Sequence, residues 1–177
     1  MTPALRLHSA DPSAALEAAF RRIERERMMG LPLLNTALKV QAVGFGRWQQ
    51  HWLGALVTPW FLNLVLVPGD AATWQRAGEA QRVFHHFGAG DFAFLGNHES
   101  EVGEFQSCSL VSPMGQFADQ ASACATARAA LGMLQVDRPA AALMGQGGAS
   151  ASGQRGAPAP VAAASALPTR RAMLFGG

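Results

Sequence analysis

An uncharged run in the middle of the chain, TPWFLNLVLVPG at residues 58–69, constrains the fold more than any other stretch. Its branched and aromatic side chains predict a buried β-strand from Phe61 to Val67. Pro59 has no N–H to donate to a β-ladder, so it predicts a break between this strand and an earlier one that begins at Trp52. Pro68 and Gly69 close the run as a turn. The sequence therefore predicts two strands that are neighbours in a sheet.

The same run contains a polar residue, Asn63, inside the predicted strand. Its amide must find a hydrogen-bond partner, because leaving it unsatisfied costs about 1–3 kcal/mol. In one interpretation the run is a core strand pair, and an internal backbone group satisfies the amide. In the other, Trp60, Phe61 and Asn63 line a groove or sheet edge that binds an extended peptide. We expect Leu64 to Val67 to be core, and Pro59 to Asn63 to be exposed and to face a partner.

Helices are expected on both sides of this strand block. Asp11 and Pro12 are typical of a helix start, and apolar residues follow at helical spacing until Gly30. A second helix is expected over 117–134, a further one at the start of 74–87, and further strands over 39–45, 91–96 and 104–112. Short connections between strands favour antiparallel pairing. We predict an α/β fold of the α+β type, a mainly antiparallel sheet of about five strands with two principal helices.

The composition changes after Pro139. Ala, Gly, Ser and Pro dominate the following stretch, which has a single charged residue, Arg155, and cannot bury enough surface to offset chain entropy. We therefore predict a domain over residues 1–137, a flexible linker over 138–167 and a C-terminal motif over 168–177 that docks on the domain.

Charge and hydropathy exclude several classes of partner. The net charge is +2 and the basic residues are scattered, so no nucleic-acid binding is expected. No charge-free apolar run reaches the roughly 18 residues of a membrane span, so no membrane insertion is expected. The first residues lack the pattern of a signal peptide. We expect a cytoplasmic protein whose cysteines remain thiols.

Motifs of catalysis and metal binding are missing from the sequence. It contains no GxSxG, no GxGxxG that follows a strand, and no Walker motif, so we expect no enzyme and no cofactor. Cys108 and Cys124 do not form a CxxC pair, and the adjacent histidines His85 and His86 cannot converge on one ion, so we expect no metal site. Arg128 would lower the pKa of Cys124 and make it reactive; alternatively, both cysteines are small buried hydrophobes.

Three segments follow one another in the chain: TPWFLNLVLVPG at 58–69, FQSCSLVSPM at 105–114 and RRAMLFGG at 170–177. Together they resemble the assembly-chaperone family of [NiFe] hydrogenases, whose members are called HybE, HupJ or HoxT. The resemblance runs from around Pro12 to Leu134 and resumes at the C-terminal motif. It implies a cytoplasmic chaperone without catalysis that serves an uptake hydrogenase. Such a chaperone holds the small-subunit precursor, which carries a twin-arginine signal and accepts iron–sulfur clusters, until its cofactors are in place.

The resemblance also implies contact with the large subunit and protection of nascent clusters from oxygen. Some relatives carry a fused rubredoxin domain that this chain lacks, so a separate rubredoxin is a further expected partner. The C-terminal motif looks like a twin-arginine signal at the wrong end of the chain. It either imitates the client signal in the binding groove, or packs on the core through Ala172 to Phe175. The residues expected to contact partners are Pro59, Trp60, Phe61, Asn63, Ser107, Cys108, Ser109, Arg170, Arg171 and Phe175.

Two other functions are compatible with the sequence. One is a redox or metal-handling accessory protein that uses Cys108 and Cys124. The other is a purely structural subunit, which would stay bound to the mature hydrogenase.

Overall fold

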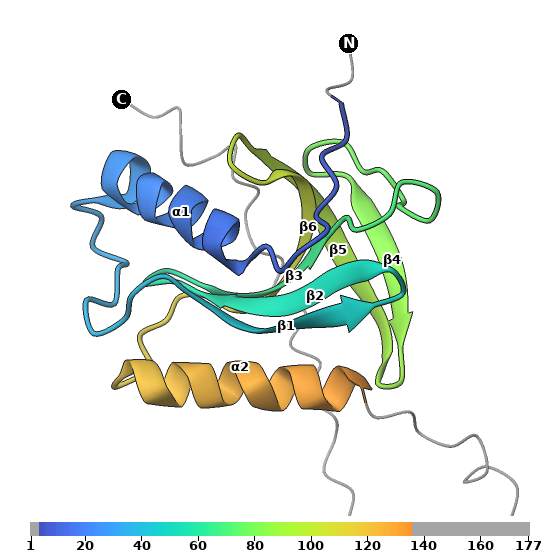
Figure 1. The fold of residues 1–177 in the computed structure, drawn as a ribbon. Coiled ribbons are helices and arrows are strands. Elements are labelled where there is room, and N and C mark those ends of the chain that lie inside the picture. Colours follow the sequence, from blue (N-terminus) through green and yellow to red (C-terminus); the bar gives the residue numbers. More distant parts are fainter. Residues whose placement is uncertain (1–3, 136–177) are drawn as a thin grey trace, which may run out of the picture. The chain divides into compact units, whose positions relative to one another are not determined.

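The computed structural model describes residues 4–135, which fold around one six-stranded antiparallel sheet (Figure 1). The strands are β1 (Gln41–Trp48), β2 (His51–Val57), β3 (Leu62–Val67), β4 (Arg82–Phe87), β5 (Gly90–Glu99) and β6 (Gly103–Val111). Their spatial order is β1-β2-β3-β6-β5-β4, so β6 lies between β3 and β5. The helices are α1 (Ser13–Ile23), which continues into a π-helical turn η1 (Glu24–Met28), and α2 (Gln120–Gln135). The predicted α+β class, the antiparallel sheet and the two principal helices are confirmed.

The structure has one strand more than expected, and the difference lies in β4. The helix expected at the start of 74–87 is wrong, since 82–87 is a strand and no helix is assigned over 74–81. Burial alternates along β4 with the period of two that is typical of a strand, because Val83, His85 and Phe87 face the protein. Trp48 stacks on Phe87 and meets His85 edge-to-face, so tertiary contacts with β1 hold this strand.

Helix α1 begins one residue after the position that the sequence predicts, with Pro12 as its N-cap and Ser13 as its first residue. The Asp11 carboxylate accepts a hydrogen bond of 2.8 Å from the backbone N–H of Ser13, which satisfies one of the free donors at the helix start. The helix buries the face that carries Leu16, Ala19, Phe20 and Ile23. The chain leaves the following π-helical turn at Gly30, whose φ of +85° is a conformation that glycine adopts readily.

Strand β3 is buried on both faces, because the two helices lie on opposite sides of the sheet (Figure 1). Leu62, Leu64 and Leu66 point into a core shared with α2, whereas Val65 and Val67 point into a second core shared with α1. A strand covered on both faces requires a continuous apolar run rather than an alternating pattern. This explains the run from which the sequence analysis started.

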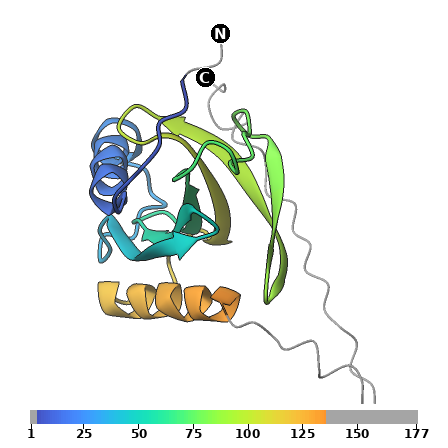
Figure 2. The same ribbon diagram turned by 45° about the vertical axis from the view of Figure 1, so that its right-hand side comes forward.

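The helices do not cover the whole sheet. Figure 2 shows β4 at the edge of the sheet, away from α1. On the α1 side, Phe84 of β4 and Leu95 of β5 are 65% and 41% exposed. No helix among residues 4–135 is long and apolar enough to cross a membrane. The predicted linker (138–167) and C-terminal motif (168–177) lie outside the described residues, as do Arg170, Arg171 and Phe175.

Candidate functional site

The turn between β2 and β3 is built around a fully buried threonine, Thr58. Its Oγ1 accepts hydrogen bonds from the backbone N–H groups of Phe61, at 2.9 Å, and Trp60, at 3.3 Å. Pro59 occupies a turn position at which no ladder N–H is needed, and its carbonyl accepts a hydrogen bond of 2.8 Å from the N–H of Asn35. The predicted ladder break at Pro59 is confirmed.

The side chains in this turn are not exposed, which corrects the expectation for Pro59, Trp60 and Phe61. Trp60 is 6% exposed and Phe61 is 8% exposed, because α1 packs over them. Phe61 meets Phe20 of α1 edge-to-face at 5.6 Å and Trp60 at 5.5 Å. The two aromatic residues therefore belong to the core shared with α1, and their direct contact with a partner remains a prediction that this burial does not favour.

Asn63 is the polar exception in β3. It pairs with Leu56 of β2 and with Ser109 of β6, and its side chain is partly exposed. Its Oδ1 atom, however, is buried and has no hydrogen-bond partner within residues 4–135. The internal partner that the sequence analysis considered is therefore missing for this oxygen among the described residues. An acceptor left in this state lowers the stability of the free protein.

Ser107 and Ser109 lie on the same face of the sheet as Asn63. Residues paired across a sheet share a face, and Asn63 pairs with Ser109 while Ser107 pairs with Leu95. Ser107 is held by Asn97, whose Nδ2 donates to its Oγ at 3.0 Å. The structure thus brings three of the predicted contact residues together on one face, beside the exposed Leu95.

We call this surface the open face and define it by Asn63, Ser107, Ser109, Leu95 and Phe84. Its polar part was predicted from the sequence. Its apolar part was missed, because the segment that contains Phe84 had been expected to begin as a helix. No clear signal in the sequence would have found it, because RVFHHF does not alternate apolar and polar residues, and only the burial along the strand alternates.

The cysteines lie on the other side of the sheet. Cys108 packs against the core shared with α2, and burial raises the pKa of its thiol above the ordinary value. Cys124 is 4% exposed, and its Sγ donates to Oε1 of Gln41 at 3.4 Å. A thiol with a raised pKa is a poor nucleophile at neutral pH. Within residues 4–135, no group of three or more His, Cys, Asp or Glu side chains could hold a metal ion.

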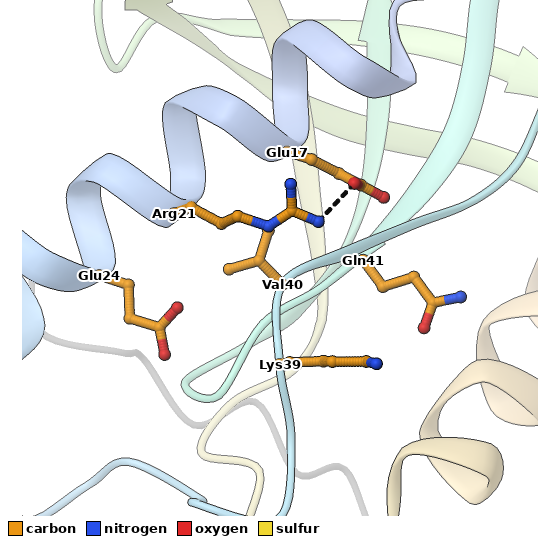
Figure 3. Close-up of a pocket in the computed structure, with 6 residues that line it drawn as sticks. All are labelled: Glu17, Arg21, Glu24, Lys39, Val40 and Gln41. Atoms are coloured by element: carbon orange, nitrogen blue, oxygen red, sulfur yellow. Dashed lines mark hydrogen bonds and ion pairs between the residues drawn. The ribbon is translucent and has the colours of Figure 1, made fainter.

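A pocket of about 380 Å³ lies between α1 and the segment before β1 (Figure 3). Glu17 and Arg21 of α1 line it and form an ion pair of 2.7 Å, drawn as a dashed line in Figure 3. The other carboxylate oxygen of Glu17 accepts the backbone N–H of Ala42 at 2.9 Å. These contacts give Glu17 a structural role in joining α1 to β1. The remaining lining residues are Glu24, Lys39, Val40 and Gln41.

The fold is that of an α+β domain, and comparison with known proteins identifies its family. Residues 11–176 match the model of the family described as "[NiFe]-hydrogenase assembly, chaperone, HybE". The chain belongs to this family, which is one of assembly chaperones and not of enzymes.

Relatives and a solved structure agree with this assignment. The hydrogenase expression/formation protein HupJ of Bradyrhizobium diazoefficiens is 43% identical over 121 residues, which are 68% of this chain and 70% of the relative. A protein of Rhodobacter capsulatus named probable rubredoxin HupJ is 37% identical over 67% of this chain, and the match spans 42% of that protein. The solution structure of HybE from Escherichia coli has the same fold, with a TM-score of 0.63 and 24% identity over 89% of this chain and 98% of that one.

Proposed function

We propose that this protein is a cytoplasmic chaperone in the maturation of an uptake [NiFe] hydrogenase. Its client is the small-subunit precursor, which bears the twin-arginine signal and accepts the iron–sulfur clusters. The protein holds the precursor until its cofactors are in place, contacts the large subunit, and protects nascent clusters from oxygen. Membership of the assembly-chaperone family supports the hydrogenase as the client.

The observation that carries the binding role is the buried Oδ1 of Asn63 without a partner in the described residues. It lies next to Ser109, which is exposed, and Ser107, which is partly exposed. Buried polar atoms in native proteins are almost always paired, and an exception often marks a functional site. In the proposed complex the partly exposed side chain of Asn63 turns outward, and a backbone N–H of an extended client segment supplies the donor that Oδ1 lacks.

The test is a pull-down of the tagged full-length protein from cells that synthesise the hydrogenase. Wild type is expected to retain the small-subunit precursor and to release it after maturation. Asn63→Leu removes the unpaired acceptor without opening a cavity and should weaken retention. Met133→Ser, at a 68% exposed position on α2, is the control and should retain the precursor as wild type does.

The two alternative functions predict different results. Stoichiometric retention of the mature hydrogenase instead of the precursor would show a structural subunit. Loss of maturation in a Cys108→Ser, Cys124→Ser double variant that still folds would show a redox or metal-handling role. The raised pKa of Cys108 speaks against that role, and we expect normal maturation.

We extend the proposal to a separate rubredoxin as a partner that acts beside this chaperone. Its support is the Rhodobacter capsulatus relative named as a rubredoxin, of which this chain spans less than half. Retention of a rubredoxin in the same pull-down is the expected result.

A further inference from the structure

The outer edge of β4 is one end of the sheet, and β1 is at the other end of the strand order. Among residues 4–135, no strand pairs with this edge. The opposite edge is interrupted, because β1 contains a bulge between Val43 and Gly46. Strand β4 pairs with β5 in an unbroken register, and it contains no Lys, no Pro and no bulge, the devices by which natural proteins usually block an edge.

The hydrogen bonds of β5 show which backbone groups of β4 are free. The N–H of Gly96 donates to the carbonyl of Gln81 at 2.9 Å, so Gly96 directs its backbone groups toward the β4 side. The direction of the backbone N–H and C=O groups alternates from one residue of a strand to the next. Phe94, two residues before Gly96, therefore also directs these groups toward β4 and exchanges hydrogen bonds with its partner Val83. Every second residue of β4, counted from Val83, therefore bonds to β5.

The other residues of β4 direct their backbone groups to the outer edge of the sheet. Arg82, Phe84 and His86 direct their backbone N–H and C=O groups away from β5 and toward solvent. The side chains of the same three residues lie on the α1 side of the sheet, since Arg82 pairs with Leu95 of the open face. One edge thus combines free backbone groups with an exposed apolar surface formed by Phe84 and Leu95. An extended peptide strand is the ligand that satisfies both features, because it pairs through its backbone and places alternate side chains on one face.

The charges on this edge limit the sequence of the ligand. His86 Nδ1 lies 2.8 Å from a carboxylate oxygen of Asp91, so these two residues are partners. Arg82 is exposed and forms no ion pair within residues 4–135. The Arg82 guanidinium is therefore available to a carboxylate of the ligand, and it disfavours a pair of arginines placed beside it.

We propose that the outer edge of β4 binds an extended segment of the hydrogenase precursor as an added strand. This segment has apolar side chains at alternate positions, which contact Phe84 and Leu95, and an acidic residue that meets Arg82. It is distinct from the twin-arginine pair of the signal. The proposal deepens the proposed function and rests on it, because it assigns a surface and a type of segment to the same client.

The test is the affinity of purified full-length variants for the small-subunit precursor, measured by biolayer interferometry. Phe84→Ser removes the apolar contact, His86→Pro removes an outward N–H without breaking the β4–β5 ladder, and Arg82→Glu reverses the charge. Each is expected to weaken binding about tenfold or more, as loss of a central contact does. Met133→Ser is matched in exposure to Phe84 and should bind as wild type does. Thermal melting checks that every variant is folded; if His86→Pro does not fold, Phe84→Ser and Arg82→Glu decide.

Three results would overturn the proposal. If wild type binds the precursor and the folded variants bind equally well, β4 is not the surface, although the proposed function stands. If wild type does not bind the precursor at all, the proposed function fails and this assignment fails with it. If sedimentation shows a wild-type dimer that Phe84→Ser dissociates, a second copy of the chain occupies the edge.

Discussion

The buried amide of Asn63 bears on both the stability of the fold and the proposed binding. Its Oδ1 is buried without a partner in the described residues, although its neighbours Leu64 and Val65 are fully packed. Such an acceptor destabilises the free protein, and exceptions of this kind in natural proteins are expected at functional sites. Asn63, which the sequence already singled out, therefore has a side chain that the stability of the described domain alone does not explain.

Replacing Asn63 by leucine should stabilise the free protein by about 1 kcal/mol or leave it unchanged, because an apolar group of similar size removes the unpaired acceptor. Urea unfolding monitored by tryptophan fluorescence measures this change. Asn63→Ala is the comparison, since it removes the amide but leaves a gap. A loss of more than about 1 kcal/mol in Asn63→Leu would mean that the amide makes a stabilising contact in solution.

Trp60 is a core residue, so a Trp60→Ala variant tests stability and not binding. It is almost fully covered in the core shared with α1, so Trp60→Ala should cost about 3–5 kcal/mol in the free energy of unfolding. The same urea experiment measures this loss, with exposed Met133→Ser as the control that should change by less than about 0.5 kcal/mol. A Trp60→Ala protein as stable as wild type would show that the turn is open in solution.

At the scale of elements, an ionic cluster joins α1 and η1 to the end of β5 and to the loop that follows it. Arg22 of α1 contacts Glu101 at 2.6 Å and Glu99 at 2.8 Å, and Arg27 lies 3.3 Å from Glu99. These contacts raise the pKa of Arg22 and, through hydrogen bonds from Arg22, lower that of Glu101 to about 2. The helix that covers Trp60 and Phe61 is therefore connected to the strands that carry the open face.

This cluster predicts a pH dependence of stability. The pKa of Glu101 is about 2 in the folded protein, below its ordinary 4.5, so its contribution is present above pH 4.5 and is lost as the pH falls toward 2. Melting temperatures recorded between pH 6 and pH 2.5 should fall more steeply for wild type than for Arg22→Met. Arg25→Met, on the adjacent turn, is the control. Parallel curves for all three proteins would contradict the assignment.

At the scale of the whole molecule, a chaperone that binds its client only when folded must be stabilised by that client. Saturation at 100 times the dissociation constant adds about 2.7 kcal/mol to the free energy of unfolding. The purified precursor should therefore raise the melting temperature of this protein, and mature hydrogenase should not. Equal stabilisation by both forms would favour a structural subunit.

Local sequence patterns determined the strands around Pro59, the Asp11–Pro12 helix start and the second helix, because each depends on neighbours in the chain. Turn chemistry and the continuous apolar run of β3 act over a few residues. The same patterns singled out Asn63, whereas Ser107 and Ser109 became candidates through the family resemblance, and nothing local shows that the three share a face.

The tertiary structure decided what is covered and what is open. Insertion of β6 between β3 and β5 places Ser109 beside Asn63, and packing of α1 buries Trp60 and Phe61, which the sequence analysis had expected to be exposed. The strand that contains Phe84 was predicted incorrectly, because the contacts of Trp48 with His85 and Phe87 that hold it come from a distant part of the chain. Periodicity predicts which side of an element is apolar, whereas strand order and helix packing determine whether that side meets the core or a partner.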